Sequence, residues 1–221
     1  MKITSKLIVA FVALFYLASC GGPGENRAEI MERLEAGEIP EAVDVYRISA
    51  EESTIAWVGT KIGGAHDGTI ALDRGELYVF DGELLAGEVV VDMQQIVVLD
   101  IEDPGSNARL KAHLESDDFF SVEKFPSAFF EITAVEAVEV PVPGEKTHRV
   151  FGNMTIKGIT HGIAFDALIG TSEDSLLAYA DFTLDRTRWD VRFGSGRFFD
   201  NLGDNLIHDD FRLTLDIIAR K

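Results

Sequence analysis

The chain has 221 residues, of which 46% are hydrophobic, and a formal net charge of -18 at pH 7. This hydrophobic content is sufficient for a folded domain with a sizeable core and excludes a chain that is disordered throughout. The strong negative charge argues against nucleic acid as a partner, because phosphate backbones attract basic protein surfaces.

The first 20 residues have the parts of a secretory signal peptide. Lys2 and Lys6 precede the apolar run LIVAFVALFYLA, and Ser19 and Cys20 follow it. This apolar run is too short for a comfortable membrane span. The ending L-A-S-C resembles the lipobox of bacterial lipoproteins, which implies that residues 1–19 are removed and that Cys20 becomes lipid-modified. An ordinary signal peptide, or an apolar helix with an incidental cysteine, is the alternative.

Cys20 is the only cysteine of the chain, so no internal disulfide can form. Removing residues 1–19 takes away two lysines and no acids, which leaves 18 basic and 38 acidic residues, a net charge of -20. Each buried methylene of an attached acyl chain contributes about 0.8 kcal/mol to membrane binding. The sequence therefore predicts a lipid-anchored protein of the bacterial cell envelope that faces the periplasm, with exposure at the cell surface as the alternative.

Residues 20–45 are predicted to be a tether between this anchor and a folded domain. The segment begins with glycine and proline, and AEIMERLEAG within it has the composition of two or three helical turns.

From about residue 46 apolar and polar residues alternate with a period of two, which is typical of strands. TIAWVGT, AGEVVVDMQQIVVL and SAFFEITAVEAVEV are examples, and Asp81-Gly82 and Lys157-Gly158 are typical turn sequences between such segments. About eight strands with short connections favour a sandwich or a closed antiparallel barrel. We therefore predict one all-β domain over residues 46–221.

One segment departs from this alternation. Between Asp100 and Asp118, Leu110 and Leu114 have the i, i+4 spacing of a helix, and Ser106 or Asn107 could cap its N-terminus. The prediction is a single short helix that crosses between two strands.

Several short motifs of this chain occur in the same order in a known family. They are Trp57-Val-Gly, His66-Asp-Gly, Val91-Asp92-Met93, HLESDDFFSVEKFP, GNMTIKGIT and Asp185-Arg186-Thr187. This series resembles the YceI-like family over roughly residues 46–220. The resemblance implies an extended, lipocalin-like antiparallel barrel that binds a polyisoprenoid lipid or an isoprenoid quinone in a long apolar interior, in the periplasm. It thus implies a hydrophobic lipid ligand and no other cofactor.

The apolar faces of the predicted strands supply candidate ligand-binding residues. In a barrel most of these side chains point inward, where they either pack a solid core or line an isoprenoid tail. The candidates on strands are Trp57, Phe130, Ile132, Phe165, Phe182 and Leu213. Phe119, Phe120 and Phe125 follow the predicted helix, where they either cap the core or gate the entrance.

Two polar residues are candidates for the head group of such a ligand. His66 lies beside a turn glycine, where it either bonds across a loop or reaches the ligand. Arg186 lies in an arginine-rich segment, and an arginine can hold a phosphate or carboxylate in a bidentate manner. Pairing of these arginines with Asp185, Asp190 and Asp200 is the alternative.

The sequence offers little support for catalysis or metal binding. It contains no H-x-x-x-H pair, no EF-hand loop, no G-x-S-x-G elbow and no P-loop. We therefore predict a lipid-binding protein with no catalytic residues and no metal. A homodimer is a possible oligomeric state. Two alternatives remain: an enzyme on an envelope lipid that uses His66, His161 or Asp67 as acid or base, and a solidly packed barrel without a ligand.

Overall fold

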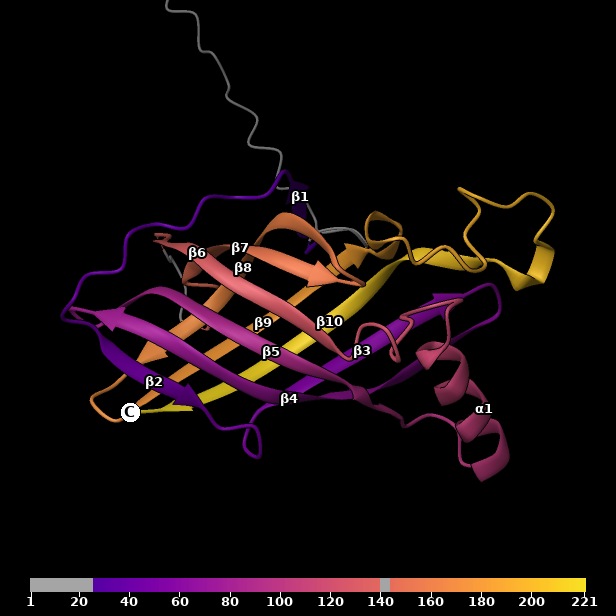
Figure 1. Cartoon of the computed structure of the whole chain (residues 1–221), viewed down its shortest axis with the longest axis horizontal. Helices are drawn as coiled ribbons and strands as arrows, with labels where there is room; N and C mark the ends of the chain where they lie inside the picture. Colours follow the sequence, from indigo (N-terminus) through magenta and orange to yellow (C-terminus); the bar gives the residue numbers. More distant parts are fainter. Residues whose placement is uncertain (1–25, 140–143) are drawn as a thin grey trace, which may run out of the picture.

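Eight long strands form one closed antiparallel barrel in the computed structural model, which describes residues 26–139 and 144–221 (Figure 1). Each strand pairs with the next along the chain, and the last pairs with the first. The strands are β3 (Thr54–Lys61), β4 (Gly64–Phe80), β5 (Glu83–Val98), β6 (Ser127–Ala137), β7 (His148–Ile156), β8 (Ile159–Thr171), β9 (Ser175–Asp185) and β10 (Ile207–Arg220). The predicted all-β antiparallel barrel is thereby confirmed.

Tight turns connect consecutive strands where the sequence predicted them. Asp81 and Gly82, between β4 and β5, have positive φ angles of 52° and 83°, and Lys157 and Gly158, between β7 and β8, have 51° and 71°. Two successive positive φ angles belong to the hairpin turn whose twist matches that of the flanking strands. These dipeptides therefore determine the pairing of neighbouring strands.

Two short strands complete the wall of the barrel. β2 (Asp44–Ile48) lies between β4 and β10, the same two strands that flank β3. β1 (Glu29–Met31) pairs with the first half of β8, and the main chain of Thr183 on β9 bonds to Asn26 and Ala28. Because β8 and β9 pair with each other only through Ala167–Thr171, residues 26–31 fill the seam between them.

The described part of the expected tether is not a helix. Residues 26–34 run along the barrel, and Leu34 exchanges two hydrogen bonds with the side chain of Asn153 at 2.8 and 2.9 Å. The prediction of helical turns in AEIMERLEAG was wrong, because the backbone groups of this segment bond to neighbouring strands instead. Residues 1–25, including the expected signal peptide and Cys20, lie outside the described residues.

The predicted crossover helix is present as α1 (Pro104–Glu115), between β5 and β6. Its N-cap is Asp103, whose carboxylate accepts a hydrogen bond of 2.8 Å from the N–H of Ser106, and Pro104 follows it. The predicted caps, Ser106 and Asn107, lie three and four residues after the observed one. Proline at the first helical position and an aspartate before it are the signals that indicate the true start.

The two ends of the barrel differ. α1 and the segment between β9 and β10 project from one end, which we call the mouth end (Figure 1). At the opposite, far end, Leu77, Val79 and Leu176 fill the interior, and the buried hydroxyl of Tyr46 donates to the carbonyls of Ser172 and Glu173. Among the residues the structure describes, no helix is long and apolar enough to cross a membrane.

Candidate functional site

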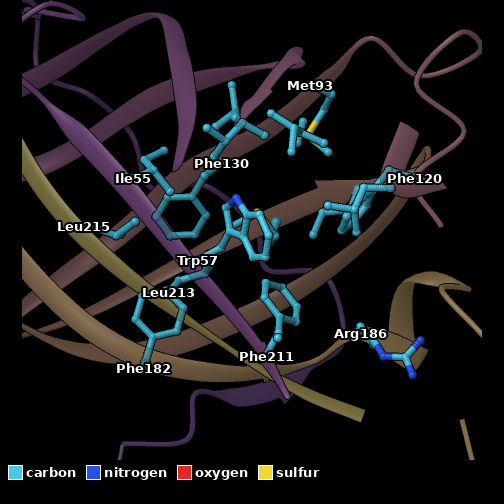
Figure 2. A pocket seen from close by; sticks show the side chains of 18 of the residues that line it. Ile55, Trp57, Met93, Phe120, Phe130, Phe182, Arg186, Phe211, Leu213 and Leu215 are labelled. Atoms are coloured by element: carbon cyan, nitrogen blue, oxygen red, sulfur yellow. The ribbon is translucent and has the colours of Figure 1, made fainter. Parts of the chain in front are cut away.

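An internal cavity of about 210 Å³ occupies the half of the barrel nearer the mouth end (Figure 2). It is far larger than the roughly 10–15 Å³ that one water molecule needs. The residues that line it are Ile55, Trp57, Gly59, Ile70, Val89, Val91, Met93, Ile96, Leu114, Phe119, Phe120, Ala128, Phe130, Met154, Ile156, Phe165, Phe182, Arg186, Ile207, His208, Phe211, Leu213, Leu215 and Ile217. The interior of this barrel is therefore open rather than packed solid.

The wall of the cavity follows directly from strand alternation. Side chains of a strand point alternately to its two faces, so every second residue faces inward. On β3 these are Ile55, Trp57 and Gly59, and on the neighbouring β10 they include Phe211 and Leu213. The cavity surface is almost entirely apolar because nearly all of these positions carry hydrocarbon side chains.

Three phenylalanines from three strands form the deep wall. Phe165 and Phe182 stack with ring centroids 4.2 Å apart and planes 17° apart, and Phe130 lies 5.6 Å from Phe165. All three are at most 8% exposed. Such aromatic contacts contribute about 0.5–1.5 kcal/mol each beyond the apolar area that they bury.

Trp57 contributes its ring face to the cavity without adding a polar group. Its indole N–H donates to the carbonyl of Thr69 at 3.2 Å, within the wall. The ring thereby presents only carbon to the interior.

Aromatic residues also surround the cavity at the mouth end. Phe119 and Phe120 follow α1 and line the cavity there, beside Leu114 of the helix. Outside them, the ring of His113 packs edge-on against Phe119 and Phe193, with centroid distances of 4.9 and 4.5 Å. Phe119 is 8% exposed, so it closes part of this end.

Arg186 lines the cavity, and it is 5% exposed. Its guanidinium donates to the carbonyls of Val191, Ile207 and His208 at 2.9, 3.2 and 3.1 Å. Burial lowers the pKa of this guanidinium, and the charge of Asp209, 3.9 Å away, opposes that shift. Because backbone carbonyls occupy its donors, Arg186 fixes the segment after β9 and has little capacity left for an anionic head group.

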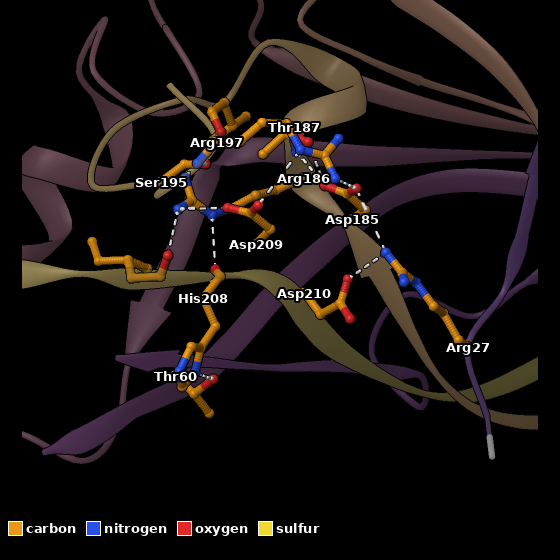
Figure 3. Close-up of polar contacts among 12 residues, drawn as sticks. Arg27, Thr60, Asp185, Arg186, Thr187, Ser195, Arg197, His208, Asp209 and Asp210 are labelled. Carbon is orange, nitrogen blue, oxygen red and sulfur yellow. Dashed lines mark hydrogen bonds and ion pairs between the residues drawn. The ribbon is translucent and has the colours of Figure 1, made fainter. Parts of the chain in front are cut away.

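A network of charges extends from Arg186 to the outer surface (Figure 3). Asp185, 4% exposed, lies 3.5 Å from the guanidinium of Arg27 and 3.2 Å from that of Arg197. Arg27 also pairs with Asp210 at 2.8 Å, and Arg197 approaches Asp209 at 3.8 Å. The three arginines of this network (Arg27, Arg186 and Arg197) thus balance its three aspartates (Asp185, Asp209 and Asp210). The network ties residue 27 to the mouth end.

The predicted acid and base residues lie outside the cavity lining. His66 contacts Asp100 through Nδ1 at 2.8 Å, and the N–H of Asp67 donates to the same carboxylate. Partial burial raises the pKa of Asp100, but the hydrogen bonds from His66 and Asp67, together with the interaction with the His66 charge, bring the net shift downward. His161 contacts the carbonyl of Arg188 at 2.9 Å. Each candidate is therefore engaged by its own neighbours, and none of the three lines the cavity.

Eight of the eleven predicted ligand-binding residues line the cavity, namely Trp57, Phe119, Phe120, Phe130, Phe165, Phe182, Arg186 and Leu213. Three do not. Ile132 is buried in the packed far half, Phe125 lies against the turn at Gly158, and His66 bonds across a loop to Asp100. Cys20 lies outside the described residues. In the part of the chain that the structure describes, no group of three or more His, Cys, Asp or Glu side chains could hold a metal ion.

Sequence reasoning missed several lining residues that share a strand face with a predicted one. Phe211 and Leu215 lie two residues on either side of Leu213, and Ile55 lies two residues before Trp57. The period of two would have found all three. His208 could not be found in this way because the register of β10 shifts between Ile207 and Phe211. Leu114 could not be found because its position depends on how α1 folds over the mouth end.

The family comparison covers most of the chain. The model of the YceI-like domain matches residues 46–219. Curated relatives include UPF0312 proteins of Pseudomonas putida strain W619 and of Pseudomonas syringae pv. tomato, each 39% identical over 62 residues. Those alignments cover 28% of this chain and 30% of each relative, so the match spans less than a third of the relatives' length.

Two solved structures share the barrel. BcnA of Burkholderia cenocepacia has a TM-score of 0.59 at 15% identity, with 78% of this chain and 99% of that chain covered. A polyisoprenoid-binding domain from Saccharophagus degradans has a TM-score of 0.56 at 11% identity, with 79% and 97% covered. At such identities the likeness shows the fold alone. The model of the YceI-like domain matches residues 46–219, which is most of the chain. The chain therefore belongs to the YceI-like family.

Proposed function

We propose that this protein is an envelope lipoprotein that binds one amphiphilic isoprenoid-type lipid, a polyisoprenoid or an isoprenoid quinone. The observation that carries the proposal is the apolar cavity inside the barrel, with its polar residues confined to the mouth end. An isoprenoid tail matches such a cavity, because its branched hydrocarbon gains about 25 cal/mol for each Å² removed from water. The similar domain from Saccharophagus degradans is described as polyisoprenoid-binding, which supports this class of ligand.

The ligand would lie with its tail among Phe130, Phe165 and Phe182 and its head at the mouth end. His208 is the exposed polar residue that lines the cavity there. Arg186 holds the backbone that forms this end rather than the head group. The role is binding, for carriage, sequestration or stress protection of the lipid, since the residues considered for acid–base chemistry lie away from the cavity.

Lipid anchoring through Cys20 and a periplasm-facing location complete the proposal. They rest on the lipobox-like sequence L-A-S-C after the apolar run. Mass spectrometry of the full-length protein purified from bacterial membranes tests both parts. We expect a diacylated or triacylated N-terminal peptide that begins at Cys20.

A matched pair of glycine substitutions tests the cavity. A Cβ atom added at Gly59 or at Gly170 would meet no atom within 4 Å, but Gly59 lines the cavity whereas Gly170 is exposed on β8. We expect Gly59→Leu to reduce the isoprenoid lipid that is extracted with the protein, and Gly170→Leu to leave it unchanged. Both variants should fold, because leucine favours the strand more than glycine does. A wild-type protein that carries no lipid and binds neither isoprenoid quinone nor polyprenyl phosphate would overturn the proposal.

A further inference from the structure

Residues 192–199, RFGSGRFF, form an exposed loop at the mouth end that we call the aromatic loop. Phe193, Phe198 and Phe199 are 40%, 41% and 49% exposed. Exposed phenylalanines that gather in one short loop are rare in water-facing surfaces, and such patches mark sites of contact with proteins or membranes. The loop projects beyond the barrel on the same end as α1 (Figure 1).

The aromatic loop is continuous with the cavity. Phe193 lies 5.5 Å, centroid to centroid, from Phe119, which lines the cavity. The carbonyl of Gly194 accepts a hydrogen bond of 2.8 Å from Ile207, another lining residue. An apolar path therefore leads from the exposed rings to the cavity.

The charge of this segment is opposite to that of the chain. Residues 186–199 contain four arginines and one aspartate, whereas the whole chain has a net charge of -18. Arg186 and Arg197 belong to the balanced network described above, so Arg188 and Arg192 are the arginines of this segment that remain for a partner. Arg188 and Arg192 are exposed, and the guanidinium of Arg192, which pairs with Asp190, lies 4.8 Å from the ring centroid of Phe198. Arginine beside exposed phenylalanine is the composition of surfaces that bind at the headgroup level of bilayers with anionic lipids.

The position of Asn26 gives an independent argument. Its carbonyl accepts a hydrogen bond of 3.0 Å from Thr183, two residues before the end of β9 at the mouth. Six residue steps separate Cys20 from Asn26, which span about 20 Å at most. Along β9 the mouth end lies about 7 Å from Thr183 and the far end about 26 Å. An anchor at Cys20 thus favours a barrel whose mouth end is near the bilayer.

We infer that the aromatic loop is a membrane-docking surface, which seats the mouth of the cavity on an anionic lipid bilayer so that the lipid passes directly between bilayer and barrel. The inference deepens the proposed function and rests on it for the anchor at Cys20 and for the lipid in the cavity. Phe193, Phe198 and Phe199 enter the headgroup region, and Arg188 and Arg192 face its phosphates.

The first test labels the full-length lipoprotein with an environment-sensitive thiol dye in vesicles of phosphatidylethanolamine and phosphatidylglycerol. Phe198→Cys places the dye in the aromatic loop, and Glu173→Cys places it on an exposed turn at the far end. We expect blue-shifted emission and quenching by headgroup-region spin-labelled lipid for Phe198→Cys alone. Equal quenching at both positions, or none at Phe198→Cys, overturns the inference. The inference is also overturned if, without vesicles, the emission of the dye at Phe198→Cys shifts to the blue as the protein concentration rises. That result would assign the loop to contact with a second copy of the chain.

The second test measures transfer of isoprenoid quinone from the same vesicles to the protein. Phe198→Ser with Phe199→Ser should slow loading severalfold, without changing the occupancy reached when the quinone is supplied in detergent. The control, Phe80→Ser with Leu177→Ser, removes side chains of similar exposure (42% and 52%) near the far end and should load at the wild-type rate. Equal rates for the two variants contradict docking.

Failure of the proposed function gives a different pattern. If wild-type protein never takes up quinone, even from detergent, lipid binding is wrong, while dye quenching still reports docking. If Cys20 of the wild-type protein reacts with the thiol dye, the cysteine is not lipidated, and the anchored docking inferred here is overturned with it.

Discussion

The indole ring of Trp57 lies against the backbone of Gly68, its direct partner across the β3–β4 pair. A Cβ atom at position 68 would lie 2.6 Å from Cζ2 of Trp57 and 1.8 Å from the carbonyl oxygen of Val97. Trp57 belongs to the Trp57-Val-Gly motif, and Gly68 is the glycine of the His66-Asp-Gly motif. Their contact gives these motifs a physical reason: glycine leaves the space in which the tryptophan forms the cavity wall.

Gly68→Ala should therefore displace Trp57 and strain the backbone of β5. We expect the free energy of unfolding to fall by about 1–3 kcal/mol, as for other overpacked sites. Urea unfolding measures this change, and tryptophan fluorescence reports the altered environment of the ring. Gly170→Ala, which adds the same methyl group in open space, should change stability little. Equal free energies of unfolding for the two variants would contradict this, because the cavity wall would then accommodate the methyl group at position 68 without loss of stability.

Arg186→Met should destabilise the mouth end rather than alter head-group preference. The substitution removes the donors to the carbonyls of Val191, Ile207 and His208, and a buried polar group without its partner costs about 1–3 kcal/mol. Titrations should show the same proportional loss of affinity for a polyprenyl phosphate and for a neutral isoprenoid quinone. Arg33→Met, at an exposed position away from the mouth-end arginines, is the control. A selective loss of phosphate binding at wild-type stability would instead make Arg186 a head-group ligand.

Phe119→Leu should accelerate lipid exchange. The leucine keeps the site apolar but lacks the ring that packs against His113 and Phe193. We expect faster release of a bound isoprenoid quinone to acceptor vesicles, with a smaller change in equilibrium occupancy. Phe125→Leu should leave the release rate unchanged, because Phe125 does not line the cavity. If both substitutions act alike, Phe119 packs this end of the barrel without controlling passage.

Asp181 on β9 and Arg212 on β10, which are diagonal neighbours across this strand pair, should make stability depend on pH. Arg212 Nε donates to Asp181 Oδ1 at 2.8 Å, and the hydrogen bonds from Arg212 lower the pKa of Asp181, whose side chain is 12% exposed. The folded-state pKa is then below the unfolded value of about 3.9. This contribution is fully present above about pH 4 and is lost as the pH falls through the folded-state pKa.

Asp181→Asn should accordingly lower the free energy of unfolding by about 1–2 kcal/mol at pH 7 and have progressively less effect below about pH 4. Urea unfolding of the variant and of wild type across this pH range measures the difference. The control is Asp174→Asn, at an exposed turn position. A difference that stays constant down to pH 2 would rule out the carboxylate charge as its cause.

The strands of the barrel could be predicted because their signal is local. Alternation places Trp57, Phe165 and Leu213 on inward faces, and the structure finds all three in the cavity wall. The same rule assigned Ile132 to the ligand, although it lies in the packed half. Alternation shows which face a residue takes but not how far along the barrel the cavity extends.

Features that depend on distant partners could not be predicted in this way. Residues 28–37 have helical composition, but β8 and β9 leave a seam that a third segment fills, so Glu29–Met31 forms a strand. Arg186 lines the cavity, but three carbonyls from residues that follow it take up its donors. Neither result can be read from the residues themselves, because the partners are supplied by the closed fold.

The strand inserted in the seam has a practical consequence for dissecting this protein. The family match begins at residue 46, but a chain shortened to that point would lack Asn26–Met31 and leave a slit between β8 and β9. Main-chain groups of Gly162–Ala164 and Thr183 would lose their partners, and Asp185 and Asp210 would lose Arg27. The smallest complete folding unit is therefore longer than the matched domain, and its first strand is contributed by the segment that precedes that domain.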